Sequence, residues 1–355
     1  MTDAHDTDVS FDPTALEAFL EEHLGSVETF DVAPGGEGKS NETCFVTWGD
    51  RDLVVRKPPA GATTDTAHDV LREYRVLSAL QGTPVPVPET VLSSEDHSVV
   101  GSDFYVMERV FGDVIRGEEP DRFGTPAHRQ RLGEEMIDTL AAIHTVDYES
   151  VGLGAGDFGY PDGYLERQVD RWTKQLEWAF GTTTDEREVP ALHDVREWLE
   201  DNLPETAEPT LVHGDYKLDN VMFGPGTPPE LAAVFDWEMS TLGDPLADLG
   251  WLLIHWYDDG DSEPLLPTTN PPFLAREGYP TRRELVDRYE RRSDVEVHDL
   301  RFYRVLAVYK EAAACEVFFA RHLLGSDDPF YPQMREQVPS IAERALRMID
   351  GDEPL

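Results

Sequence analysis

One short stretch of the chain carries the side chains that phosphoryl transfer to a hydroxyl group requires. Within Leu211–Phe223, apolar residues at both ends flank Asp215, Lys217 and Asn220, and the apolar run a dozen residues later ends in Asp236. Such a reaction needs a group that accepts the hydroxyl proton, a cation for the moving phosphoryl group and oxygen ligands for magnesium. We therefore predict Asp215 as the base, Lys217 as the cation, and Asn220 with Asp236 as metal ligands.

The residues around this stretch are expected to support it rather than to react. The apolar flanks predict a strand, a catalytic loop and a second strand. We expect His213 to brace the loop through hydrogen bonds, and Asp248, in the helix that begins near Asp244, to anchor the loop backbone. His144, at the end of a predicted helix, is expected to be a satisfied core residue. Asp258, Asp259 and Asp261 are expected to form a solvated acidic loop.

A kinase also needs backbone donors over the phosphates and a basic side chain tied to a helix carboxylate. The glycine-rich turn Gly35–Asn41 can provide the donors. Arg56, on a predicted strand, and Glu73, in the following helix, can provide the ion pair, with Lys57 as the alternative to Arg56.

The segment after the last strand of the first half is expected to hold the adenine. Extended backbone at Glu108 and Val110 would present a carbonyl and an amide to the adenine edge.

The elements needed to position these residues divide the chain into two lobes. Strands dominate the first half and helices the second, which indicates an α+β architecture with a small N-terminal lobe containing an antiparallel sheet and one helix, and a larger, mostly helical C-terminal lobe. We predict a disordered tail at 1–12, a nucleotide-binding lobe at 13–109, a hinge at 110–114 and a catalytic and substrate lobe at 115–355.

The predicted strands are Glu28–Val32, Thr43–Trp48, Leu53–Arg56, Glu89–Leu92 and Asp103–Arg109. The predicted helices begin at Pro13, Thr66, Pro126, Tyr164, Val189, Asp244, Arg282, Val297 and Tyr331.

Composition limits the partners and the environment. The chain has 71 acidic and 30 basic residues, a net charge of -41, and only five lysines among the basic residues. A small domain stays soluble with a net charge of roughly 2 to 8 in magnitude. An excess of negative charge this large is tolerable where molar salt shortens the Debye length to about 3 Å. We therefore predict that the protein belongs to the cytoplasm of a halophile, an archaeon. The sequence has no basic stripe that could bind a nucleic acid, and no run of eighteen apolar residues that could cross a membrane. The oligomeric state is left open.

The motif His213-Gly-Asp-x-x-x-x-Asn220, followed by Asp236, resembles the aminoglycoside phosphotransferase and choline kinase family of small-molecule kinases. This resemblance implies a protein-kinase-like two-lobed fold, ATP and Mg²⁺ as cofactors, and a small-molecule alcohol as acceptor. It also places Ser40 and Asn41 at the tip of the nucleotide loop, near the phosphates.

Two further segments resemble one branch of that family, which is fused to acyl-CoA dehydrogenases in animals. They are Asp236–Gly250 and Tyr279–Tyr289. The resemblance implies a hydroxy acid or a hydroxyacyl-CoA as acceptor. This sequence contains no dehydrogenase portion, so an aminoglycoside-type or choline-type alcohol stays open, as do the choice of ATP over GTP and the number of magnesium ions.

Two rival interpretations come from other classes. The segment from Ala33 to Ser40 fits the loose Walker A pattern of P-loop NTPases, but such a loop must open a helix, whereas Asn41–Trp48 is β-prone. A catalytically inactive nucleotide-binding pseudokinase is the second rival. Its usual sign is a lost base or metal ligand, and none is lost here.

Overall fold

The structure is a computed structural model that describes residues 9–35, 41–59, 70–154, 156–258, 260–261, 265 and 271–355. Its contacts divide the chain into two units, one formed by Met1–Gly112 with Ala232–Ser240 and the other by Asp113–Leu231 with Thr241–Leu355. The division after Gly112 falls inside the segment 110–114 that the sequence suggests as a hinge. The short segment Ala232–Ser240, which contains Asp236, groups with the first unit rather than with the residues around it in the sequence.

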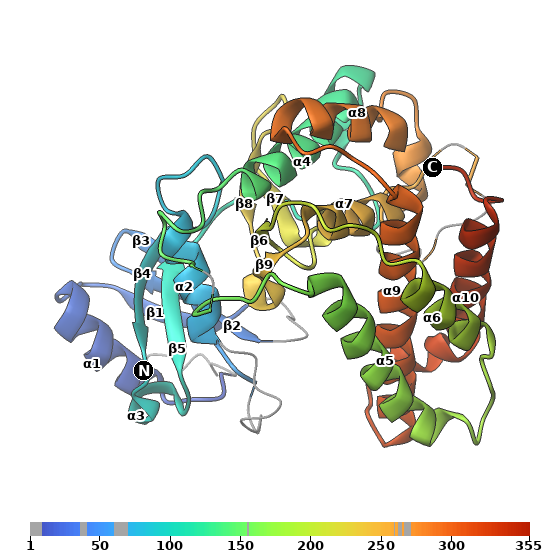
Figure 1. Cartoon of the computed structure of the whole chain (residues 1–355). Coiled ribbons are helices and arrows are strands. Elements are labelled where there is room, and N and C mark those ends of the chain that lie inside the picture. The colour runs from blue at the N-terminus through green and yellow to red at the C-terminus, as the bar shows by residue number, and fades with distance from the viewer. Residues whose placement is uncertain are drawn as a thin grey trace. The chain divides into compact units, whose positions relative to one another are not determined.

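The first unit contains an antiparallel sheet with the strand order β1-β2-β3-β5-β4 among the described residues (Figure 1). Each strand was predicted from its β-branched and aromatic residues, with ends that differ by up to two residues. The strands are β1 (Phe30–Pro34), β2 (Glu42–Trp48), β3 (Arg51–Lys57), β4 (Thr90–Ser94) and β5 (Phe104–Glu108).

The helices of this unit are α1 (Pro13–Leu24), α2 (Val70–Leu80) and the short α3 (His97–Val100), which was not predicted. Asp12 caps α1 by accepting a hydrogen bond from the Thr14 amide at 2.9 Å, and Gly25 ends it with a φ of 85°. The predicted tail 1–12 lies mostly outside the described residues. Its described part is ordered, because Val9 and Phe11 pack against the core of this unit.

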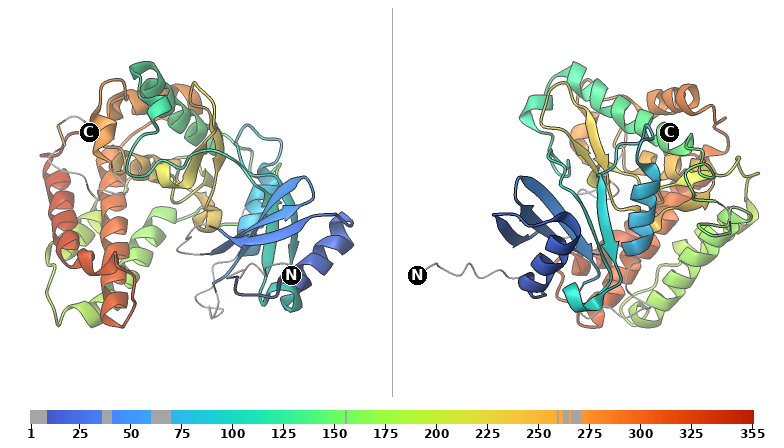
Figure 2. Two further views of the ribbon diagram at one scale, coloured as in Figure 1. Left: turned by 180° about the vertical axis from the view of Figure 1, so that it is seen from behind. Right: turned by 90° about the vertical axis from the view of Figure 1, so that its left-hand side faces the viewer.

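The two faces of the sheet pack against different helices (Figures 1 and 2). Phe104 and Val106 of β5 belong to the same buried cluster as Leu16 of α1. Side chains alternate along a strand, so Tyr105 faces the other way, and its ring lies 5.9 Å from that of Tyr74 in α2. Arg56 of β3 pairs in register with Tyr105, which places it on the face that α2 covers.

The second unit is mostly helical. Its helices are α4 (Pro126–His144), α5 (Tyr164–Thr183), α6 (Ala191–Asp201), α7 (Pro245–Ile254), α8 (Arg282–Ser293), α9 (Leu300–Leu323) and α10 (Met334–Asp350). Helix α9 is apolar on nearly every side and packs against α5, α7 and α10, as Figure 1 shows.

Short strands frame the loop that carries Asp215. They are β6 (Thr210–Val212), β7 (Val221–Phe223), β8 (Leu231–Val234) and β9 (Thr241–Gly243). β6 pairs with β9, and β7 pairs with β8. The predicted order of strand, loop and strand is confirmed, and so is the α+β class. No helix among the described residues is long and apolar enough to cross a bilayer.

Candidate active site

The loop between β6 and β7 brings together three of the predicted residues. The Lys217 ammonium donates to both carboxylate oxygens of Asp215, at 2.7 and 2.9 Å. The Asn220 Nδ2 atom donates to the backbone carbonyl and to Oδ2 of Asp215, both at 2.8 Å. The loop therefore fixes the Asp215 carboxylate from two sides.

Asp248 of α7 holds the backbone of this loop. Its Oδ2 accepts from the His213 amide at 2.6 Å and its Oδ1 from the Gly214 amide at 2.8 Å. His213 in turn accepts from the Asp215 amide through Nδ1 at 3.1 Å. The predicted anchoring role of Asp248 and bracing role of His213 are both confirmed.

His144 lies behind the anchor as a core residue, as predicted. Its Nδ1 is 2.6 Å from the hydroxyl of Tyr289, and its Nε2 is 3.3 Å from the Asp248 carboxylate. The side chain of His144 is buried and has partners on both ring nitrogens.

The charges around Asp215 keep its carboxylate ionised. Burial alone would raise its pKa, but the ammonium groups of Lys217 and Lys310 hold the pKa of Asp215 well below its usual value. The same attraction outweighs burial at Lys217 and raises the pKa of that ammonium. Asp215 and Lys217 thus form a half-buried ion pair in which both groups are charged.

Lys310 is a residue that the sequence motifs did not reveal. It lies on α9, donates to the carbonyl of Gly214, and its ammonium stands 3.5 Å from the centre of the Trp251 ring. Burial lowers the pKa of Lys310 to about 8, although the charge of Asp215 opposes this shift. The available signal was the pair Lys310–Glu311 between two apolar runs of the predicted helix, Val305–Tyr309 and Ala312–Cys315, because a charged residue at a buried position needs a partner.

In the first unit, Arg56 makes the predicted ion pair with Glu73 of α2 at 3.3 Å and a second one with Asp236 at 3.5 Å. Burial raises the pKa of Glu73, and Arg56 opposes that rise. Burial would lower the pKa of Arg56, but Glu73 and the other charges nearby raise it. Asp236 itself has a φ of 66°, a left-handed conformation that is rare outside glycine and occurs often at functional sites.

Lys57, the alternative to Arg56, points elsewhere. Its ammonium is 3.1 Å from the Glu42 carboxylate at the start of β2. The ion pair with the helix carboxylate Glu73 therefore belongs to Arg56.

The other predicted nucleotide contacts are placed only in part. Ser40 lies outside the described residues. The Asn41 side chain is 1% exposed, and neither of its amide atoms has a hydrogen-bond partner among the residues that the structure describes. The Glu108 amide donates to the Glu89 carbonyl and its carboxylate pairs with Arg51, while Val110 follows the end of β5.

The predicted acidic loop at 258–261 is wrong for Asp261. Asp259 lies outside the described residues, but the Asp261 side chain is fully buried and forms an ion pair with Arg282. Alternation and composition could not reveal this pair, because Arg282 lies 21 residues further along the chain.

The P-loop alternative conflicts with the observed elements. The residues that follow Ser40 and Asn41 form the strand β2, from Glu42 to Trp48, and not a helix. A Walker A loop binds phosphate at the N-terminus of the helix it opens, so this arrangement cannot serve in that way.

Comparison with known proteins identifies the family. A family model described as "Phosphotransferase enzyme family" matches residues 31–294. Acyl-CoA dehydrogenase family member 11 of Pongo abelii is 34% identical over 351 residues, and the human protein of the same name is 33% identical over 354. Each match covers 95% of this chain and 43% of the relative, so the chain spans less than half the length of these relatives.

Solved structures agree with the family model. A candidate aminoglycoside phosphotransferase from Ralstonia eutropha is 32% identical with a TM-score of 0.80, and the match covers 96% of this chain and 99% of that one. A second match is the GDP complex of aminoglycoside 2'-phosphotransferase-IIIa, which is 17% identical with a TM-score of 0.61. This match covers 92% of this chain and 97% of that one, and it supports the fold alone. The predicted resemblance, including the branch joined to acyl-CoA dehydrogenases, is confirmed. The chain belongs to the phosphotransferase enzyme family and has the protein-kinase-like fold of the aminoglycoside phosphotransferases.

Proposed function

We propose that this protein is an ATP- and Mg²⁺-dependent kinase that transfers the γ-phosphoryl group to a hydroxyl of a small molecule. The observation that carries the proposal is the ionised Asp215 carboxylate, held by Lys217 and Asn220 on a loop pinned by Asp248. A carboxylate in this position can orient the acceptor hydroxyl and take its proton. The lysine beside it can turn from Asp215 to the negative charge of the phosphoryl group.

The residues proposed for magnesium have a suitable donor set. The Nδ2 atom of Asn220 is committed to Asp215, which leaves the amide oxygen Oδ1 free to ligate a cation. Asp236 is the second proposed ligand and would supply a carboxylate. Magnesium takes one or two protein oxygens and completes its shell with phosphate oxygens and water, where it neutralises charge on the phosphates.

The first unit is proposed to bind the nucleotide. Arg56 would contact the phosphates, with Glu73 holding its guanidinium in place. Asn41 has a buried amide without partners among the described residues, and its Nδ2 atom could donate to a phosphate or ribose oxygen. Ser40 beside it, and the backbone of Glu108 and Val110 at the adenine edge, complete the proposed contacts.

Among acceptors, a hydroxy acid or a hydroxyacyl-CoA is favoured. Lys217 and Lys310 both lie within 6 Å of the ring centre of the buried Trp251, at 5.6 and 3.5 Å, so two cations stand close to the proposed base. An acceptor with a negative charge suits these two cations. The match to proteins named acyl-CoA dehydrogenases agrees with an acyl substrate. An aminoglycoside-type or choline-type alcohol, which is cationic, would meet these lysines less favourably.

The test is a panel of acceptors assayed for acceptor-dependent ADP release in molar KCl. The panel contains 3-hydroxy fatty acids, hydroxyacyl-CoA thioesters, choline and an aminoglycoside, each with ATP and with GTP. We expect ADP release to rise with a hydroxyacyl compound and to require magnesium. Nucleotide binding without turnover on any acceptor would instead favour the pseudokinase.

A further inference from the structure

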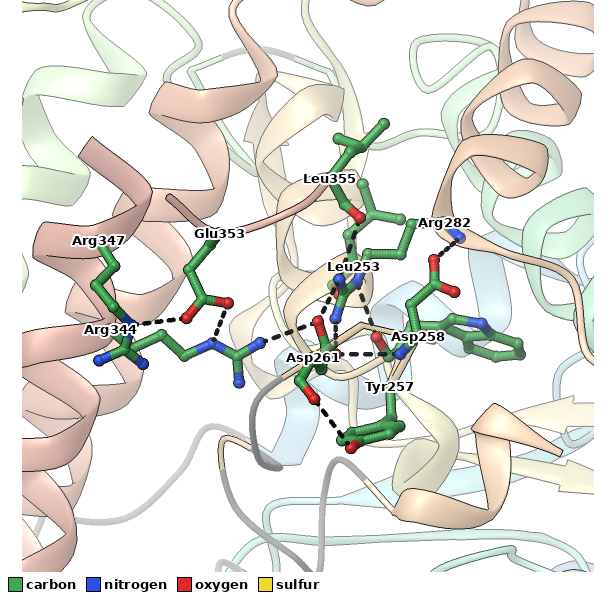
Figure 3. Close-up of polar contacts among 10 residues, drawn as sticks. Leu253, Tyr257, Asp258, Asp261, Arg282, Arg344, Arg347, Glu353 and Leu355 are labelled. Carbon is green, nitrogen blue, oxygen red and sulfur yellow. Dashed lines mark hydrogen bonds and ion pairs between the residues drawn. The ribbon is translucent and has the colours of Figure 1, made fainter. Parts of the chain in front are cut away.

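A buried group of charged residues lies in the second unit among α7, α8, α10 and the last residues of the chain (Figure 3). At its centre is Arg282, the first residue of α8, whose side chain is fully buried. Its Nη1 donates to Asp261 at 2.9 Å, and its Nε donates to the carbonyls of Leu253 and Trp256, each at 2.9 Å. The carbonyl of Leu355 accepts from Arg282 as well, at 3.1 Å.

Helix α10 brings further guanidinium groups to the same place. Arg344 lies 3.5 Å from Asp261 and 3.4 Å from Glu353, so it joins the two carboxylates (Figure 3). Arg347 contacts Glu353 from the rim at 2.9 Å. We call Asp261, Arg282, Arg304, Arg344 and Glu353 the arginine cluster.

Arg304 of α9 is the member for which the described part of the chain offers no partner. It is 5% exposed, and neither its Nε nor its Nη2 atom has a hydrogen-bond partner among those residues. These two atoms form the edge of a guanidinium that binds two oxygens at once. Arg129 presents that edge to Glu119, and Arg288 presents it to Asp138. In Arg304 the same edge has no acceptor among the described residues.

Burial makes the missing acceptor costly. Among the described residues the carboxylates of Asp261 and Glu353 pair with Arg282 and Arg344, and neither is paired with Arg304. Burial first, and then the charges of Arg282 and Arg344, lower the pKa of Arg304 to about 10, so this guanidinium is still charged at neutral pH. A buried charged group whose donors lack acceptors is costly, because nothing replaces the lost solvation.

We propose that the arginine cluster is a binding site for a small inorganic anion, chloride or a phosphate-like oxyanion, which the Nε–Nη2 edge of Arg304 holds. The anion supplies the acceptor that the paired donors lack and places a negative charge beside the Arg304 guanidinium. Since Arg282 also binds the carbonyl of Leu355 and Arg344 lies beside Glu353, the bound anion stabilises the packing of the residues after α10 against α8 and α9.

This effect differs from general screening of the acidic surface. Screening depends on ionic strength and not on which anion is present, whereas a site saturates and distinguishes anions by size. The matched control is Arg321→Met, at an exposed arginine near the other end of α9.

The test is thermal unfolding of the full chain at constant ionic strength. Potassium glutamate, whose anion is too bulky for so buried a site, is replaced stepwise by potassium chloride or by potassium phosphate. We expect a saturable rise of roughly 2 to 4 °C in the Tm of the wild-type protein and of Arg321→Met. In Arg304→Met the rise should vanish, because the binding edge is gone, and in Arg304→Lys it should fall, because a lysine has no paired edge.

A response to chloride alone identifies a halide site, and a response to phosphate alone an oxyanion site. No saturable rise with either salt, or an equal rise in Arg304→Met, would overturn the proposal. If Arg304→Met does not fold, crystals of the wild-type protein soaked in bromide decide the matter. An anomalous scattering peak at the Nε–Nη2 edge of Arg304 supports the site, and its absence overturns a halide site. The same soak with selenate or arsenate decides the oxyanion case.

Discussion

At the scale of single residues, the proposed chemistry depends on the side chains that hold the Asp215 carboxylate in place. Lys217 and Asn220 both contact it, and the two roles proposed for Asn220 use different atoms of one amide. The motif spacing made these residues predictable, because Asp215, Lys217 and Asn220 lie within six positions of one another. Arg56 and Glu73 were predictable for a related reason, since a strand and the helix after it pack together.

Lys310 and the arginine cluster were not predictable in this way. The partner of Lys310, Gly214, is 96 positions away in the sequence, and Arg344 meets Asp261 across a similar span. A periodic pattern indicates that a position is buried, but not which distant side chain it faces. Tertiary packing decides that, and a single sequence does not contain it.

The first prediction concerns the proposed magnesium ligands. Asn220→Ala and Asp236→Ala should each raise the magnesium concentration needed for half-maximal ADP release. Asp236→Ala should have the larger effect, because a carboxylate binds a hard dication better than an amide does. Asn202→Ala, at an exposed asparagine after α6, is the control. A wild-type magnesium requirement in both variants would show that the metal binds elsewhere.

The second prediction uses the titration of Lys310. Its pKa falls from 10.5 to about 8 on folding, so the folded state carries an unfavourable charge below pH 8 and loses it as the pH rises. Between pH 8 and 10.5 the unfolded state binds more protons than the folded state. As the pH rises through this interval, the wild-type protein should therefore gain stability relative to Lys310→Met, by about 1 kcal/mol per pH unit at most. Urea unfolding of both proteins from pH 7.5 to 10 measures this.

Lys174→Met is the matched control, because the Lys174 side chain is 70% exposed. Its stability difference from the wild-type protein should be independent of pH over this range. If the difference in the free energy of unfolding between Lys310→Met and the wild-type protein is also independent of pH, then the pKa of Lys310 is not lowered by folding.

At the scale of elements, α7 positions the catalytic loop through one side chain. Asp248 is 1% exposed and satisfies two consecutive backbone amides, which no other residue type of similar size can do with two oxygens. Its helix begins at the cap formed by Asp244, whose side chain accepts from the Leu246 amide at 2.9 Å. The placement of the loop therefore depends on the packing of α7.

The third prediction follows from this anchor. Asp248→Ala leaves the amides of His213 and Gly214 buried without acceptors, which should lower the free energy of unfolding by about 2 to 5 kcal/mol. Asp248→Asn keeps one acceptor oxygen and should lose less. Asp287→Ala, at an exposed position of α8, should stay within roughly 0.5 kcal/mol of the wild-type protein. Urea denaturation checks this, and an Asp248→Ala variant as stable as Asp287→Ala would contradict the anchoring role.

At the scale of the whole molecule, charge dominates. A net charge of -41 on 355 residues produces strong self-repulsion at low salt, and the net stability of folded proteins is only about 5 to 15 kcal/mol. We propose that the protein works in the salt-rich cytoplasm of a halophile. The buried ion pairs within each unit do not offset this repulsion, because it arises from exposed carboxylates.

The fourth prediction is that salt controls folding. Dialysis from molar KCl into about 0.1 M salt should unfold or inactivate the protein, because the Debye length rises from about 3 to 10 Å. Lowering the pH towards the carboxylate range at low salt should partly relieve the repulsion. Circular dichroism over a KCl series measures both effects. An unchanged Tm between about 0.1 M and 2 M KCl would contradict the halophile assignment and leave the kinase assignment intact.

The central claim is that Asp215 is the base of a phosphoryl transfer, and the most direct measurement compares the wild-type protein with Asp215→Asn. Transfer of labelled γ-phosphoryl from ATP to the acceptor found in the panel is measured alongside ATP binding. Since the base acts on the acceptor and not on the nucleotide, we expect ATP binding to be nearly unchanged and transfer to fall by about 10² to 10⁴. A transfer rate within tenfold of the wild-type rate would show that Asp215 is not the base.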